Sequence, residues 1–161
     1  MRWSCLLILF VLCGCSEVWP RPTPHTIPFE TIEQSGAYYD GPIDINPSLI
    51  LLTSPEQIVN IEAKITSQTR DALLLIDFQR YVVIGLFRGL TPTGGYNTTI
   101  TQITQHENQV VVHAELQNPD GGADEISAPY HLVKVARTQL PIEQLELVLE
   151  STFVTPTPLV R

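Results

Sequence analysis

The residue with the most specific chemistry in the sequence is Cys15, because of the residues that precede it. The chain starts with a positive charge, Trp3 to Cys13 is almost entirely apolar, and Gly14 stands directly before the thiol. A charged start, an apolar run of about 7–15 residues and a small residue at the cut are typical of an export signal. The run is too short for a mature membrane helix, which needs about 20 apolar residues. We therefore predict a signal peptide over residues 1–14.

The order Leu12-Cys13-Gly14-Cys15 resembles the lipobox of bacterial lipoproteins, in which the thiol is diacylated and becomes the new N-terminus. Of the three Cys, Cys5 and Cys13 would leave with the signal, so no disulfide within the chain and no Cys-based metal site remain. One acyl chain, at ~0.8 kcal/mol per buried methylene, binds a membrane only marginally, and a lipoprotein Cys carries two or three. We predict lipidation at Cys15 and a domain held outside the cytoplasm at the bacterial cell membrane. The alternative is a plain secretory signal with an incidental Cys.

Motifs for nucleophilic, metal-dependent or phosphate chemistry do not occur in the sequence. It contains neither Gly-x-Ser-x-Gly nor His-Glu-x-x-His, and neither a Walker loop nor Gly-x-Gly-x-x-Gly. Two of the four His, His113 and His131, lie on separate expected strands that could pair and hold zinc. We favour two strand histidines with hydrogen-bonding neighbours. We thus predict a protein that is not an enzyme and that has no metal site and no cofactor.

An oxygen-rich segment runs from Asn118 to Glu125 and includes Gly121 and Gly122. Calcium takes six to eight oxygen ligands and often binds such loops. The spacing does not match an EF-hand, so we favour a solvated acidic loop. Asn97-Thr98-Thr99 has the form of a glycosylation sequon, but in a bacterial chain we interpret it as the start of a strand.

The length of 161 residues is that of one domain, since domains hold roughly 100–200 residues. Seventeen acidic against nine basic side chains give a net charge of -8, which argues against a nucleic-acid partner. Val18 to Pro28 is proline-rich without hydrophobic periodicity, which predicts an extended tether over residues 15–28. A similar composition near the end predicts a loose tail over 151–161. The single β-rich domain would then span residues 29–150.

Strand patterns dominate between these segments. Strands are expected at 29–33, 49–53, 81–87, 96–105, 110–116, 130–136 and 145–149. Ile100 and Ile103 break the strict alternation of their strand, so a β-bulge is expected there. The run of strands predicts an α+β fold that is mainly antiparallel β, sandwich- or barrel-like, with one helix in the N-terminal half.

That one helix is expected to begin at Ser54. Ser54 can cap it, Pro55 suits its first turn, and Gln57 completes a capping box. Three isoleucines follow with a spacing that places them on one face, which we expect to be buried: Ile58, Ile61 and Ile65.

The most distinctive loop joins two expected strands and is our candidate partner-contact site. Its residues are Thr91, Pro92, Thr93, Gly94, Gly95 and Tyr96. Paired glycines permit a positive φ, which we expect at one of the two at least. Two interpretations stay open: Tyr96 packs inward and the loop only turns the chain, or the loop tip is exposed and meets a partner.

The order of features from Asp77 to about residue 140 resembles the C-terminal domain of the PrcB family, named for a lipoprotein subunit of a bacterial surface protease complex. The features are the strand at 81–87, the Thr93-Gly94-Gly95-Tyr96 turn and the strand opening Ala128-Pro129-Tyr130. The family often has a basic residue before the proline of its third loop, where this chain has Asn118. The resemblance implies a membrane-anchored, non-catalytic subunit that binds an extracytoplasmic protease or another envelope protein.

A second resemblance implies an alternative function. The loop from Thr91 to Tyr96 is similar to the Asn-Pro-Thr-Thr-Gly-Tyr loop of chagasin-type cysteine-protease inhibitors, which insert it into a protease cleft. Here Thr replaces the Asn and Gly replaces the second Thr, and the later Arg-Pro-Trp element of that family is not found. The alternative is therefore a loop-type protease inhibitor.

Overall fold

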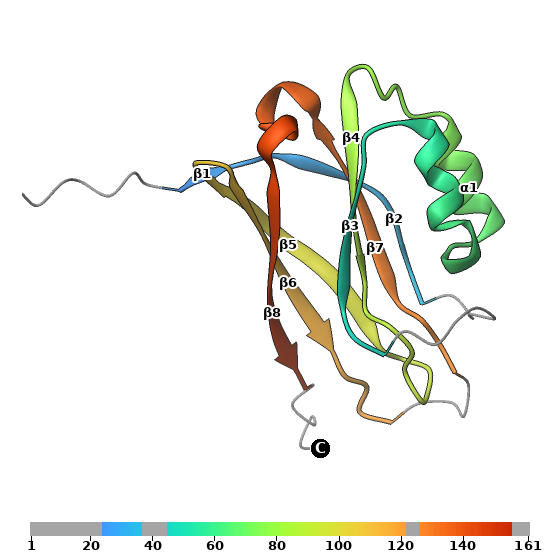
Figure 1. Cartoon of the computed structure of the whole chain (residues 1–161). Coiled ribbons are helices and arrows are strands. Elements are labelled where there is room, and N and C mark those ends of the chain that lie inside the picture. Colours follow the sequence, from blue (N-terminus) through green and yellow to red (C-terminus); the bar gives the residue numbers. More distant parts are fainter. Residues whose placement is uncertain (1–23, 37–44, 122–125, 156–161) are drawn as a thin grey trace, which may run out of the picture.

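The computed structural model describes residues 24–36, 45–121 and 126–155. Its strands form two four-stranded sheets packed face to face, and a helical layer covers the outer side of the second sheet (Figure 1). The predicted signal peptide and Cys15 lie outside the described residues. No helix of the described residues is long and apolar enough to cross a membrane.

The strand order of each sheet follows from the hydrogen-bonded pairs. The first sheet runs β1 (His25–Thr26), β5 (Asn97–His106), β6 (Gln109–Gln117) and β8 (Glu146–Val154). The second runs β2 (Phe29–Ser35), β7 (Tyr130–Ala136), β4 (Tyr81–Phe87) and β3 (Ser48–Leu52). All pairs are antiparallel except β6 with β8, which is parallel. The predicted α+β, mainly antiparallel fold is confirmed.

Side-chain alternation explains which strands lie inside. In β6 every second residue is buried, namely Val110, Val112, Ala114 and Leu116, and these face the second sheet. The central strand β4 is buried on both faces, which explains its continuous apolar sequence. Val82, Ile84 and Leu86 pack between the sheets, whereas Val83 and Phe87 pack under the helical layer.

Gly85 allows the strands of the second sheet to carry large side chains beside it. A Cβ at this position would lie 2.6 Å from Leu132 Cδ2 and 2.8 Å from Ile50 Cγ1. A glycine within a strand often marks such a close approach.

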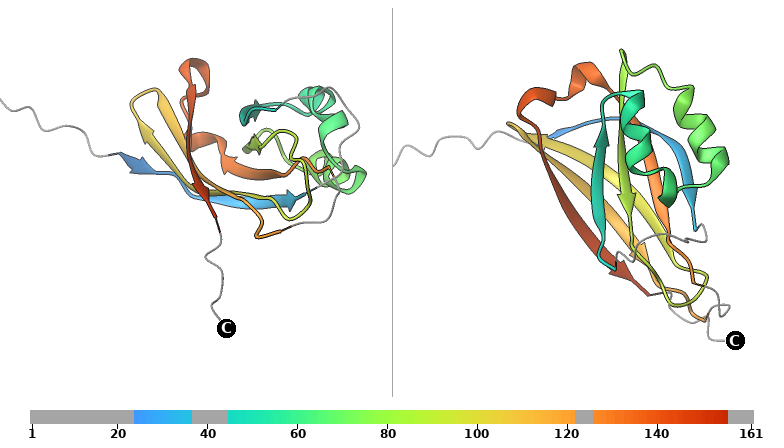
Figure 2. Two further views of the ribbon diagram at one scale, coloured as in Figure 1. Left: turned by 90° about the horizontal axis from the view of Figure 1, so that it is seen from below. Right: turned by 45° about the vertical axis from the view of Figure 1, so that its right-hand side comes forward.

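The helical layer differs from the prediction. In place of one α-helix from Ser54, the chain forms two 3₁₀ helices, η1 (Pro55–Asn60) and η2 (Glu62–Lys64), and then α1 (Ser67–Leu74) (Figure 2). The Ser54 side chain caps nothing, and Gln57 Oε1 accepts from the Thr53 N–H at 2.6 Å. The cap that forms belongs to Thr66, whose Oγ1 accepts from Thr69 N at 3.1 Å.

The buried isoleucine face is nevertheless confirmed. Ile58 and Ile61 are 4% and 3% exposed, and Ile65 packs against the same cluster. A spacing of three residues brings side chains together in a 3₁₀ helix as well as in an α-helix, because 3₁₀ side chains at i and i+3 eclipse. The periodicity therefore identified the buried face but not the type of helix.

The tether and tail boundaries of the sequence prediction were wrong. His25 and Thr26 pair with Gln105 and Thr104, and Ile27 is buried with its N–H bonded to Ile103 O at 2.9 Å. The N-terminal segment thus joins the first sheet and crosses to the second as β2 (Figure 2). At the other end β8 continues to Val154 because its β-favouring Ser151–Val154 segment pairs with β6. The domain therefore begins by residue 25 and extends to 154.

Two short 3₁₀ helices, η3 (Arg137–Gln139) and η4 (Ile142–Gln144), lie in the connection from β7 in the second sheet to β8 in the first. The β-bulge expected in β5 is confirmed, with a register shift between Ile100 and Gln102. This bulge matters for the site below, since it changes the hydrogen bonding of Ile100.

Candidate functional site

The loop between β4 and β5 contains the predicted contact residues and is fixed at its base. Thr91 is buried, and its N–H and C=O both bond Ser127, at 2.8 and 3.2 Å. Thr91 Oγ1 also lies 2.8 Å from Ser127 Oγ. A short antiparallel bridge thus ties the β4–β5 loop to the residues before β7.

Glycine conformation shapes both ends of this loop. Gly89 has φ 88° and Gly95 has φ 87°, so the prediction of a positive φ at Gly94 or Gly95 is confirmed at Gly95. A Cβ at Gly95 would also lie 3.0 Å from Pro119 Cβ. Both the left-handed backbone and the close approach to Pro119 therefore favour glycine.

Arg88 holds the end of the sandwich together. Its Nη1 donates to Asn97 O at 3.0 Å and to Gln117 O at 2.9 Å, and its Nη2 donates to Asn118 Oδ1 at 2.5 Å. The guanidinium lies 4.7 Å from the centre of the Tyr96 ring. One side chain thus connects β4, the start of β5 and the end of β6.

Burial makes this arginine unusual, because the side chain is only 7% exposed. Desolvation lowers the pKa of the Arg88 guanidinium, while the Tyr96 ring beside it raises that pKa. An arginine nonetheless keeps its charge in proteins. Sequence patterns do not reveal this role, since the acceptors lie 9 to 30 residues away along the chain.

A pocket of about 310 Å³ opens beside Arg88. It is lined by Arg88 with Ile45, Asn46, Pro47, Leu90, Thr91, Pro92, Tyr96 and Phe153. Three candidate residues of the loop therefore line one depression, together with β8 and the segment before β3. Ile45 and Phe153 at this pocket are 69% and 64% exposed.

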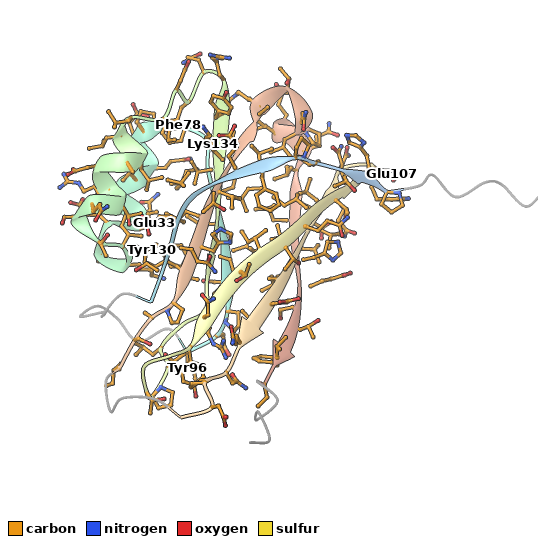
Figure 3. All side chains as sticks on the ribbon, turned by 180° about the vertical axis from the view of Figure 1, so that it is seen from behind. Glu33, Phe78, Tyr96, Glu107, Tyr130 and Lys134 are labelled. Atoms are coloured by element: carbon orange, nitrogen blue, oxygen red, sulfur yellow. The ribbon has the colours of Figure 1, made fainter. Side chains whose placement is uncertain are left out.

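One structural feature of each interpretation of the loop is observed, while its contact with a partner stays a prediction. Tyr96 is half-buried against Arg88, as the structural interpretation expects. Pro92 and Gly95 are exposed, as the contact interpretation expects. Tyr96 lies at the end of the molecule opposite Glu107 (Figure 3). The loop is therefore a rigid feature at one end of the sandwich.

The alternative in which the strands of His113 and His131 pair and hold zinc was wrong, because β6 and β7 belong to different sheets. The favoured interpretation, two strand histidines with hydrogen-bonding neighbours, is confirmed. His131 is buried, its Nδ1 accepts from Ile100 N at 2.8 Å, and its Nε2 lies 2.9 Å from Thr31 Oγ1. Burial lowers the His131 pKa to about 4. Within the described residues, no three His, Cys, Asp or Glu side chains gather as a metal site would need.

A hydroxyl, an imidazole and a carboxylate line up on the outer face of the first sheet. His113 Nε2 lies 2.9 Å from Thr104 Oγ1, and His113 Nδ1 lies 3.2 Å from Glu150 Oε2. Enzymes use the same order of hydroxyl, imidazole and carboxylate to activate a nucleophile. A structural explanation is simpler than a catalytic one, because the register places His113 directly opposite Glu150 on the neighbouring strand. Sequence reasoning missed the group because its members come from three strands.

The first residue of the oxygen-rich loop after β6 forms a structural hydrogen bond. Asn118 Oδ1 accepts from Arg88 Nη2. Residues 122–125 of this loop lie outside the described residues. Asn97 Oδ1, at the sequon, accepts from Gln34 Nε2 at 3.1 Å and from Thr98 N at 2.8 Å, which places it at the start of a strand as expected.

A comparison with family models supports the first resemblance. The family described as PrcB C-terminal matches residues 82–136. The matched segment comprises nearly all of β4, then β5, β6 and β7, and includes Arg88 and the whole loop from Thr91 to Tyr96. This part of the chain is thus similar to the PrcB C-terminal family, which agrees with the resemblance seen in the sequence. No curated protein and no solved structure matched the chain.

Proposed function

We propose that the protein is a membrane-anchored, non-catalytic envelope lipoprotein that acts as a protein-binding accessory subunit, with an extracytoplasmic protease as its partner. The observation that supports this proposal most is the PrcB C-terminal match over residues 82–136. That family takes its name from a lipoprotein subunit of a surface protease complex. The lipobox before Cys15 agrees with such a protein.

The geometry of the domain also suits this role. The chain enters the first sheet at β1, which pairs with the last residues of β5, whereas the contact loop precedes the first residue of β5. At about 3.3 Å per strand residue, the two ends of β5 lie roughly 30 Å apart. The described chain thus enters the sandwich at the end opposite the loop.

Capture of the partner tests the proposal. The purified chain, immobilised on beads, should retain an extracytoplasmic protease from envelope extract of the source cell. Thr93→Arg places a bulky charge on the loop and should abolish this retention. Gln109→Arg adds the same charge at the opposite end of the sandwich, where Gln109 is exposed, and should not affect it. If both variants retain the same proteins as wild type, the loop is not the contact.

A second candidate is loop-type protease inhibition, favoured by the rigid base of the β4–β5 loop at Thr91 and Ser127 and by its exposed Pro92. A rigid loop loses little conformational entropy when it enters a cleft. Inhibition constants against a panel of cysteine and serine proteases would distinguish the candidates. Nanomolar inhibition that Thr93→Arg removes would favour the inhibitor, whereas partner capture without inhibition favours the accessory subunit.

A further inference from the structure

The charge of Arg88 is not neutralised by any described residue. A guanidinium has five N–H donors, and the acceptors that Arg88 bonds are two backbone carbonyls and one amide oxygen, all neutral. Across residues 24–36, 45–121 and 126–155, no carboxylate forms an ion pair with it. A buried charge is costly unless it is paired, so this guanidinium favours an anion at its side.

The pocket beside Arg88 adds apolar chemistry to this charge. Apolar or aromatic side chains of Ile45, Leu90, Pro92, Tyr96 and Phe153 line it. The volume of about 310 Å³ accommodates one or two side chains. An occupant that matches this surface carries a carboxylate next to an apolar group, because a guanidinium binds a carboxylate with paired hydrogen bonds.

We propose that this pocket binds an Asp or Glu side chain of an extended segment of the partner protein, with an adjacent apolar side chain against Phe153 and Ile45. The proposal rests on the proposed function, since it names the chemistry by which the accessory subunit holds its partner. The complementary charge is the carboxylate that Arg88 lacks among the described residues.

The edge of β8 beside Phe153 favours an extended segment as the occupant of the pocket. β8 is the last strand of the first sheet, so its outer edge pairs with no described strand. Its residues Ser151–Val154 are exposed and uncharged. Strand edges without charges accept extended peptides by backbone hydrogen bonding. A segment that pairs with the edge of β8 reaches the pocket at the end of this strand and places one side chain in it.

Three N-acetylated tripeptides test this proposal on the ¹⁵N-labelled full chain by NMR titration. The first is N-acetyl-Phe-Asp-Leu-amide, the second has Asn in place of Asp, and the third has Asn together with a free C-terminal carboxylate. Physiological ionic strength is used, because its Debye length of about 8 Å screens the net negative charge of the chain.

The Asp peptide should shift the Arg88 Nε–H and the Phe153 amide, and it should bind at least about tenfold more tightly than the Asn peptide. Equal binding of both peptides would overturn the proposal. Tighter binding of the free-carboxylate peptide would overturn the assignment to a side chain.

Two variants locate the contact. Phe153→Ala should weaken the Asp peptide several-fold. It should change the melting temperature little, because the side chain is 64% exposed and its ring centre lies 5.9 Å from the Arg88 guanidinium, at the limit of a cation–π contact. Leu75→Ala, which changes a side chain 86% exposed beyond the end of α1, is the matched control and should leave binding unchanged. Arg88→Lys keeps the charge but loses the paired donors, so it should also weaken the Asp peptide. If Phe153→Ala and Leu75→Ala bind alike, the peptide lies elsewhere.

The outcomes separate this proposal from the function on which it rests. Peptide binding needs no partner protein, so a failed partner capture together with selective Asp binding would overturn only the proposed function. Partner capture that Phe153→Ala does not weaken would overturn only the pocket.

Discussion

His131 connects the two sheets at the level of a single residue. It lies on β7 of the second sheet, and its Nδ1 accepts the N–H of Ile100 on β5 of the first sheet. The β-bulge between Ile100 and Gln102 interrupts the ladder there. Because Nδ1 accepts, the ring is neutral with its proton on Nε2, which donates to Thr31 Oγ1.

This contact predicts a pH dependence of stability. Burial holds the His131 pKa at about 4 instead of its ordinary 6.5, so the folded state binds the proton less readily than the unfolded state. The contribution of His131 is complete above pH 6.5 and decreases as the pH falls towards 4.

His131→Asn retains an acceptor for Ile100 N and cannot titrate in this range. The free energy of unfolding, measured in urea from pH 7 to 4, should therefore fall less steeply with pH in this variant than in wild type. The difference in slope should correspond to the uptake of about one proton at most on unfolding. His106→Asn, at an exposed strand end, should keep the wild-type slope. Identical slopes for His131→Asn and wild type would show that His131 titrates normally.

Gly95 provides a second prediction at this scale. Gly95→Ala should lower the free energy of unfolding by on the order of 1 kcal/mol or more, because Ala is strained at φ 87° and its Cβ would press on Pro119. Gly94 is not among the described residues with a positive φ, so Gly94→Ala is the control and should cost less. Urea denaturation measures both, and equal costs would contradict the assignment of the strain to Gly95.

At the level of elements, the strands were easier to predict than the helices. β4 and β7 have the predicted ends, because apolar, β-branched sequences such as Tyr81–Phe87 stop abruptly at polar residues. The parallel pairing of β8 with β6 was not predicted, since an alternating pattern identifies a buried face but not the neighbouring strand. The cap of α1 at Thr66 was missed because Ser54 offered the more familiar capping box.

The 3₁₀ segment still makes a strong prediction for packing. Ile61→Ala should cost ~2–5 kcal/mol, as other deletions of buried aliphatic side chains do, because Ile61 is 3% exposed within the cluster beneath the helical layer. Val59→Ala, at a position 68% exposed on the same helical segment, should change stability by less than ~0.5 kcal/mol. Chemical denaturation of both variants checks this. Similar small costs would place Ile61 at the surface in solution.

For the whole molecule, the sequence indicated the site only in part. The loop from Thr91 to Tyr96 was recognisable from its glycines and proline. The sequence did not identify the other pocket residues Arg88, Ile45 and Phe153. They meet only when the ends of β4 and β8 and the segment before β3 come together in the fold. The predicted N-terminal boundary of the domain was wrong for a related reason. Ile27 follows a proline-rich segment, and its burial depends on distant contacts with β5.

The last prediction concerns the attachment of this domain to the membrane. Cys15→Ser removes the only thiol that the lipobox can acylate, so the protein should move from the membrane fraction to the soluble or secreted fraction of the cell. The physical reason is the loss of two or three acyl chains, each contributing ~0.8 kcal/mol per buried methylene. Cys13→Ser is the matched control, because it changes a thiol within the signal and leaves the acylated position intact. Fractionation after a high-salt wash, followed by detection of the full-length and processed forms, distinguishes lipid attachment from electrostatic adsorption, which salt screens. A Cys15→Ser protein that stays with the membrane after this wash would refute the proposal that the protein is a lipoprotein.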